Sequence, residues 1–216
     1  SATCRGPTLG PYLLPHVVSM LHRQYQELSL YIRESSPRDL EFDLGKGVHD
    51  VVLSQLPVGG ADLVSETLFR EPLYLALAVD HPLASHETLP VRALKGLDIL
   101  SLSPQYTLYE QVSGLCETFQ ANLLRDYEGT SLDALRQMVG MGMGAAFLPA
   151  LYTHTEIQAR SEIVVKRIAG RSITRTIGLV WRKSAGRSSS FKSIAALMRA
   201  VADKKFPDLQ VMSAPG

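Results

Sequence analysis

Cysteine is scarce in this chain, and with other absences this excludes several classes of protein. The 216 residues include two cysteines, Cys4 and Cys116, too few for a disulfide-stapled secreted scaffold and without metal-ligand spacing. The longest apolar stretch, residues 138–152, contains three glycines and a proline and is too short to span a bilayer. No phosphate-binding loop or Ser-His-Asp arrangement stands out in the sequence, and we expect no signal peptide. We therefore expect a cytoplasmic protein that is not an enzyme and has no metal, no cofactor and no membrane partner.

An excess of one charge is also lacking. Lys and Arg total 22 and Asp and Glu total 21, a formal net charge of +1. Domains that bind nucleic acid by themselves usually carry a basic face, so this balance argues against such a role for the chain alone. Hydrophobic residues make up 45% of the sequence, enough for one large core or two small ones in a globular protein.

The most informative stretch that is present is TSLDALRQMVGMGMGAAFLPAL, residues 130–151. Thr130 or Ser131 can cap a helix, and Leu132, Leu135, Met138 and Val139 follow at the spacing of one buried helical face. Three glycines then predict a sharp corner, and residues 145–148 predict a buried strand that ends at a proline. A polar helix N-terminus at such a junction can hold a small polar or anionic ligand, or it can simply be capped.

Elsewhere the pattern alternates between strands and helices. It predicts helices over residues 11–22, 40–47, 108–124 and 191–204, and strands over residues 28–34, 48–53, 73–79, 99–102, 163–168 and 176–182. This order predicts an α/β fold with helices on both faces of the sheet. The tail after Phe206 is expected to be frayed.

Five separated blocks carry a resemblance that covers nearly the whole chain. They are PTLGPYLLPHV (7–17), L-x-x-G-x-x-D (44–50), LYLALAVDHPLA (73–84), the TSLDALRQMV…GAAFLPAL block and RTIGLVWR (175–182). In this order they resemble the effector-binding (regulatory) domain of LysR-type transcriptional regulators, and within that family its peroxide-sensing members.

The resemblance implies two Rossmann-like lobes, as in type 2 periplasmic binding proteins, joined by two crossover strands. Lobe I would comprise residues 1–69 plus 175–206, lobe II residues 70–174, and residues 207–216 a flexible tail. The family's N-terminal winged helix-turn-helix is expected to be absent from this chain. The full-length protein would then form homodimers and homotetramers and bind promoter DNA through that domain.

The resemblance places effector contacts at Thr8, Thr107 and Ser131, in the cleft between the lobes. Each hydroxyl precedes or begins a helix, where free N–H groups and the helix dipole favour an anion or a polarised small molecule. The alternative for each is that the hydroxyl only caps its own helix.

The resemblance also locates the thiol chemistry. Peroxide-sensing members carry a reactive cysteine at the position of Thr107 and a resolving cysteine at that of Cys116. A hydroxyl is a much poorer nucleophile than a thiolate, so their two-cysteine switch cannot operate here in the same way. Cys116 is then either a buried hydrophobe or a slow redox thiol, and Cys4, beside Arg5, is a second candidate for the reactive thiol.

In the family, one lobe packs against the other lobe of a second chain, which implies dimer contacts at Val18, Ile32 and Met141. The favoured function is regulation of transcription in response to redox state or a small effector or oxidant. The alternative is a stand-alone small-solute-binding protein of the periplasmic-binding-protein type, since the fold alone does not fix the function.

Overall fold

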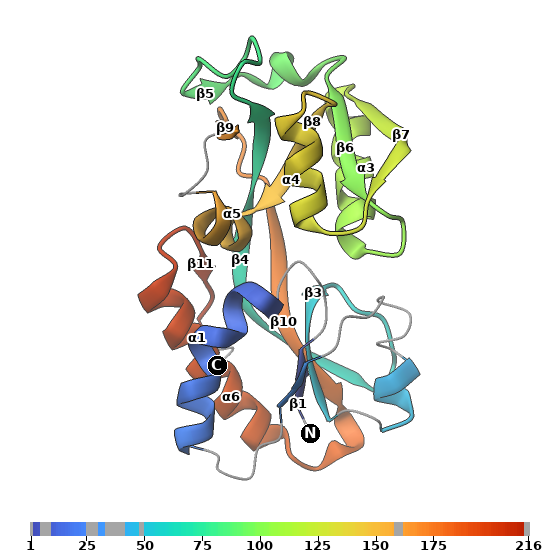
Figure 1. Ribbon diagram of the computed structural model, residues 1–216. Coiled ribbons are helices and arrows are strands. Elements are labelled where there is room, and N and C mark those ends of the chain that lie inside the picture. The colour runs from blue at the N-terminus through green and yellow to red at the C-terminus, as the bar shows by residue number, and fades with distance from the viewer. Residues whose placement is uncertain are drawn as a thin grey trace. The chain divides into compact units, whose positions relative to one another are not determined.

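The chain builds two α/β units and passes from one to the other twice. The computed structural model describes residues 2–4, 10–24, 30–32, 42–47, 50–157 and 162–213 (Figure 1). The first unit comprises Ser1–Glu71 and Arg175–Gly216, and the second comprises Pro72–Thr174. No described helix combines the length and the apolar character that a membrane span requires.

The first unit is built on a mixed sheet with the strand order β2-β1-β3-β10-β4. β1 pairs in parallel with β2 and β3, whereas β10 is antiparallel to β3. Gly178 of β10 allows a close approach, because a Cβ there would lie 2.6 Å from the carbonyl oxygen of Glu66. The strands are β1 (Ala2–Cys4), β2 (Leu30–Ile32), β3 (Val51–Leu56), β4 (Leu63–Ala78), β10 (Thr174–Arg182) and β11 (Gln210–Val211).

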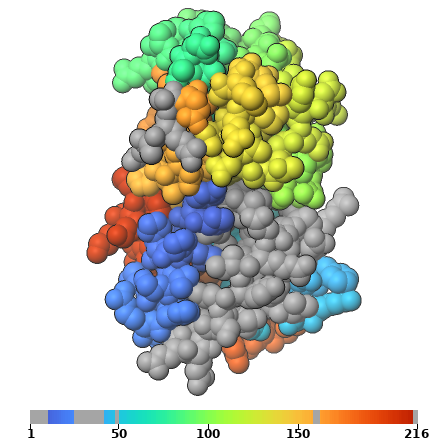
Figure 2. Space-filling model, in the orientation of Figure 1, coloured from blue at the N-terminus to red at the C-terminus, as the bar shows by residue number. Residues whose placement is uncertain are grey.

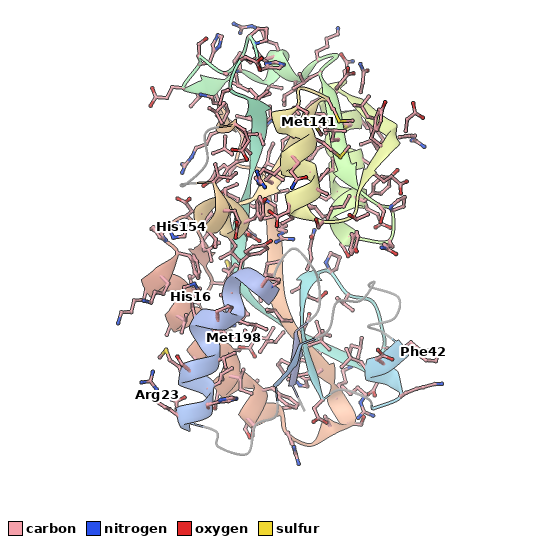
Figure 3. The ribbon with its side chains drawn as sticks, viewed as in Figure 1. His16, Arg23, Phe42, Met141, His154 and Met198 are labelled. Carbon is pink, nitrogen blue, oxygen red and sulfur yellow. The ribbon has the colours of Figure 1, made fainter. Side chains whose placement is uncertain are left out.

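Two long helices of the first unit, α1 (Gly10–Gln24) and α6 (Ser188–Lys205), lie side by side (Figure 1). α1 buries leucine and valine side chains at helical spacing, Leu13, Leu14, Val17 and Leu21. α6 is fixed to the sheet through Trp181 of β10, whose indole packs 5.6 Å from the ring of Phe191 and donates to Ser188 Oγ at 3.3 Å. A short helical turn at residues 42–45 carries the exposed Phe42 (Figure 3).

The second unit is centred on β6 (Asp98–Leu102), which pairs in parallel with both β7 (Asn122–Gly129) and β8 (Ala145–Pro149). The second half of β4 lies antiparallel to β8 and to β9 (Ile163–Ile168), and the short β5 (Thr88–Leu89) pairs with β9. The helices are α3 (Thr107–Phe119), α4 (Leu132–Gly140) and α5 (Ala150–Glu156), with 3-10 turns η1 (Val91–Leu94) in this unit and η2 (Lys183–Ala185) in the first.

The passages between the units fall within two strands, β4 and β10. Pro72, the first residue of the second unit, lies within β4 and has no N–H to donate to a neighbouring strand. Just before it, the carboxylate of Glu71 accepts from Arg175 Nε at 2.6 Å, and both side chains are almost completely buried (0% and 1% exposed). A second buried pair joins β4 to α6, where Arg199 Nη1 lies 2.8 Å from Glu66 Oε1. Both arginines come from the returning part of the chain, which they attach to β4.

The α/β fold expectation is confirmed, but several boundaries were wrong. The predicted helix at residues 108–124 ends at Phe119, because Gln120 adopts a left-handed conformation (φ 54°) and the following residues form β7. α5 was not predicted, and β4 begins ten residues before the predicted start at Leu73. The tail is not frayed at residues 207–213, since β11 pairs with β4 and Met212 N donates to Leu68 O at 2.9 Å.

The buried pair at the passage gives a stability prediction. Arg175→Leu leaves the Glu71 carboxylate buried without its partner and is expected to lower the free energy of unfolding by about 3–5 kcal/mol. Replacing both residues with leucine should restore part of this loss. Urea unfolding followed by circular dichroism measures both effects, with the exposed Arg171→Leu as the control. A double variant no more stable than Arg175→Leu would show that the uncompensated charge is not the cause.

Candidate functional site

Two helix N-termini meet at one edge of the sheet in the second unit. α3 follows β6 and α4 follows β7, and these strands are parallel neighbours, so both helices begin at the carboxyl edge. α3 leads on to β7, whereas α4 leads in the opposite direction to β8 on the far side of β6. Right-handed crossovers that run in opposite directions place their helices on opposite faces of the sheet. This is the switch point at which open α/β sheets bind ligands.

The segments that enter the two helices are hydrogen-bonded to each other. Ser103 N, just after β6, donates to the carbonyl of Gly129 at the end of β7 at 3.3 Å, and the register pairs Leu102 with Gly129. This fixes the start of α4 relative to the turn that leads to α3. Thr107 is the first residue of α3 and Ser131 is the N-cap of α4, so both lie at this edge of the second unit. Their convergence on an effector stays a prediction.

Ser131 is the N-cap of α4. Its Oγ accepts from Ala134 N at 3.1 Å, and its own backbone is extended (φ −154°, ψ 166°), as N-cap residues require. The capping alternative therefore holds for this hydroxyl. The capping bond uses the oxygen as an acceptor, so the Ser131 O–H can still donate to a ligand.

Thr107 has a different position. It is the first residue of α3, after an N-cap, Tyr106, whose side chain makes no capping hydrogen bond. Thr107 is half-buried. Its own N–H lies in the first turn, ahead of Tyr109 N, which donates to the Tyr106 carbonyl at 3.0 Å. The first N–H groups of a helix have no acceptor one turn before them. A bound molecule at this point could meet both the hydroxyl and the positive end of the helix dipole.

A buried arginine that the sequence analysis missed holds α4 in place. Arg136 Nε donates to Tyr152 Oη of α5 at 3.1 Å, and Arg136 Nη1 pairs with the Glu162 carboxylate. Tyr152 Oη in turn donates to Asp133 Oδ1 at 2.7 Å. Burial and the hydrogen bond to Asp133 raise the pKa of the Tyr152 phenol, which stays a donor at neutral pH. The sequence spacing could have revealed this buried arginine, because Arg136 follows Leu132 by four residues and so lies on the same buried face of the helix. Met138, which was predicted for that face, is only half-buried.

Cys116 is buried in the core of the second unit at 3% exposure, on the face of α3 that also buries Val112 and Phe119. Burial, with a smaller contribution from the charge of Glu117, raises the pKa of its thiol from 9.0 to about 11. At neutral pH only about one molecule in ten thousand would carry the thiolate that reacts with oxidants. The position of Cys116 in the core agrees with the buried-hydrophobe alternative, and the redox role of its thiol stays a prediction. Leu123, inside the helix predicted over residues 108–124, belongs instead to β7.

The structure describes the remaining predicted residues in different detail. Thr8 lies outside the described residues, and for Cys4 and Ile32 only the strand backbone is described, in β1 and β2. Val18 is half-buried on α1, whereas Met141 is 70% exposed just after α4 (Figure 3). Figure 2 shows that α4, in yellow, contributes to the surface of the second unit on the face drawn.

No group of three or more potential metal ligands occurs among the residues that the structure describes.

Residues 6–203 match the family model of the LysR substrate binding domain, and the chain belongs to that family. It is 36% identical over 200 residues to the DNA-binding transcriptional dual regulator OxyR of Escherichia coli K12, an alignment that covers 93% of this chain and 65% of the relative. The chain thus spans somewhat less than two thirds of the length of that regulator. A solved structure of the reduced form of OxyR matches with a TM-score of 0.83 and 33% identity, covering 95% of this chain and 96% of the other.

A second solved structure is a cysteine-to-serine mutant of Corynebacterium glutamicum OxyR with hydrogen peroxide bound. It has a TM-score of 0.87 and 27% identity and covers 94% of this chain and 64% of the other. These relatives confirm the fold of two periplasmic-binding-protein-like lobes. They are transcription regulators and do not favour a stand-alone solute-binding protein.

The state of Cys116 leads to a pH prediction. In the Cys4→Ser background, alkylation of native Cys116 by iodoacetamide should be negligible at pH 7 and should increase as pH approaches about 11. Because the folded-state pKa is raised, the stability that the neutral thiol contributes is present below pH 9.0 and is lost as pH rises to about 11. Cys116→Ala should remove that part of the pH dependence. Rapid labelling of the folded chain at pH 7 would contradict the burial.

Proposed function

We propose that this chain is the regulatory domain of a LysR-type transcription factor that reads its signal by non-covalent binding. The full-length protein would act in the cytoplasm as a dimer or tetramer on promoter DNA. The observation that carries the proposal is the pairing of a hydroxyl, Thr107, at the start of α3 with a buried, weakly acidic thiol, Cys116, further along the same helix. A covalent switch between these two positions lacks its nucleophile.

The ligand that this arrangement suits is a small polar molecule. The Ser131 hydroxyl and the first turn of α3 offer donors, and an oxygen-rich molecule such as a peroxide can accept from them. The relatives include hydrogen peroxide-inducible genes activators, and the peroxide-bound relative carries a serine in place of a cysteine. Thr8, Thr107 and Ser131 are the effector contacts that we propose.

Redox sensing by the Cys4 thiol is the second candidate function. Cys4 lies in β1 between β2 and β3, in the first unit, whereas Cys116 lies in the second. An oxidant would then act on a single thiol or form a disulfide with another chain, and the adjacent Arg5 favours the thiolate.

Oxidation followed by intact-mass analysis distinguishes these mechanisms. After graded hydrogen peroxide or diamide, the folded chain should gain no oxygen or disulfide at Cys116. Thr107→Cys should acquire one oxygen atom or a disulfide, because a helix N-terminus lowers a thiol pKa. Thr118→Cys, exposed near the other end of α3, is the matched control and should react more slowly. A rapid, reversible change in the unmodified chain that is lost in Cys4→Ser or Cys116→Ser would support a thiol switch instead.

Dimer formation through Val18, Ile32 and Met141 is the assembly that we propose. Met141 is 70% exposed, so its side chain is accessible to a second chain. Val18→Asp should convert dimers to monomers in multi-angle light scattering, because a carboxylate at an apolar contact is strongly disfavoured. Ser19→Asp, on the exposed side of α1, is the control and should leave the dimer intact. A dimer that persists in Val18→Asp would remove this residue from the interface.

A further inference from the structure

A side-chain amide connects the helix that begins at Thr107 with the strand that leaves the second unit. Gln111, one turn into α3, donates from Nε2 to the main-chain carbonyl of Thr174 at 2.8 Å. The two residues are 63 positions apart, and Thr174 is the last residue of the second unit. The bond therefore attaches α3 to the last residue of the second unit, just before β10 enters the first unit.

The next residue along β10 is Arg175, which is held by the buried carboxylate of Glu71 at 2.6 Å. On the other strand, Leu73 N donates to the carbonyl of Ile173 at 2.9 Å, so the two passages are joined on either side of this point. An uninterrupted series of contacts thus runs from α3 through Gln111 to Thr174, and through the adjacent Arg175 to Glu71. Both ends of the series are fixed: α3 by the burial of Leu108 and Val112, and Arg175 by its ion pair.

We propose that Gln111 is a positioning residue that transmits the state of the α3 N-terminus to the two passage strands. α3 is short, 13 residues, so a molecule that shifts its first turn also shifts the Gln111 amide. Because Thr174 accepts through its main-chain oxygen, this displacement acts directly on the backbone of β10. The biological meaning of this coupling rests on the proposed function, since it makes the helix that bears Thr107 the source of the signal.

The main-chain acceptor cannot be removed by substitution, so the donor is the group to change. Gln111→Leu removes the donor and keeps much of the volume. Gln111→Glu keeps the length, but its carboxylate cannot donate at neutral pH. Gln137→Leu is the matched control, because Gln137 is exposed on α4. Thr107→Asp changes the first turn of α3 without any effector and serves as the stimulus.

Hydrogen exchange measured by mass spectrometry reads out the coupling in peptides that cover residues 72–76 and 173–177. Gln111→Leu and Gln111→Glu should each accelerate exchange there by about five-fold, the effect of one lost hydrogen bond, whereas Gln137→Leu should not. A purely structural role of Gln111 would also produce this faster exchange. Transmission requires in addition that Thr107→Asp alters exchange in these peptides in the wild-type background, and that this response disappears when Gln111 is replaced.

The experimental outcomes distinguish the coupling through Gln111 from the proposed non-covalent function. The inference is overturned if Thr107→Asp leaves the passage peptides unchanged, or if their response survives in Gln111→Leu while α3 itself still responds. Because no effector is used, failure of this test leaves the proposed non-covalent function untouched. Conversely, an oxidation result in favour of a thiol switch would overturn the proposed function and leave the measured coupling in place.

Discussion

The ion pair between Glu71 and Arg175 is the contact on which the first unit depends, because that unit is assembled from both ends of the chain. A carboxylate and a guanidinium removed from water stabilise a protein only when each satisfies the other, and either alone would be strongly destabilising. The pair therefore also acts on register, because a slip of β10 by one residue would turn Arg175 to the other face of the strand and away from the Glu71 carboxylate. Glu66 and Arg199 impose the same requirement on α6. Two acidic residues of β4 thus position β10 and α6, the main elements that follow residue 174.

The second unit follows a different rule, since it is one continuous segment and needs no such anchor. Its parallel strands β6 and β7 deliver α3 and α4 to one edge, and the bond from Ser103 N to Gly129 O joins the two entrances. Arg136 then holds α4 against α5 through Tyr152 and against the start of β9 through Glu162. The hydroxyl of Ser131 is consequently carried by a helix that is anchored at its middle residue, Arg136, and a preformed binding site needs such support.

Periodicity predicted the helices α1, α4 and α6 and the strands β6, β8 and β9, because each buries apolar residues at a regular spacing. Periodicity gave wrong boundaries where tertiary contacts determine the end of an element. Nothing local marks the end of α3 at Phe119, since Leu123 and Leu124 continue the helical spacing although they belong to β7. Of the site, Ser131 was readable as a cap and Cys116 as a core residue. Gln111 was not, because its acceptor is a main-chain carbonyl 63 residues away and any residue could supply it.

If Thr107 stands where the relatives carry a reactive thiol, as the resemblance implies, the energetics of sensing change as well as the chemistry. A disulfide stores the signal in a covalent bond that persists until a reductant removes it. A molecule held by Thr107 and Ser131 can shift the domain only by the difference between its affinities for the two conformations, and the shift ends when the molecule leaves. Such a sensor needs a conformational equilibrium that is already nearly balanced. The buried pair at residues 71 and 175 keeps the two strands together in either state, so we expect the balance to be set at weaker contacts. The neutral hydrogen bond from Gln111 to Thr174 is such a contact, because a bond of this kind contributes only about 1 kcal/mol.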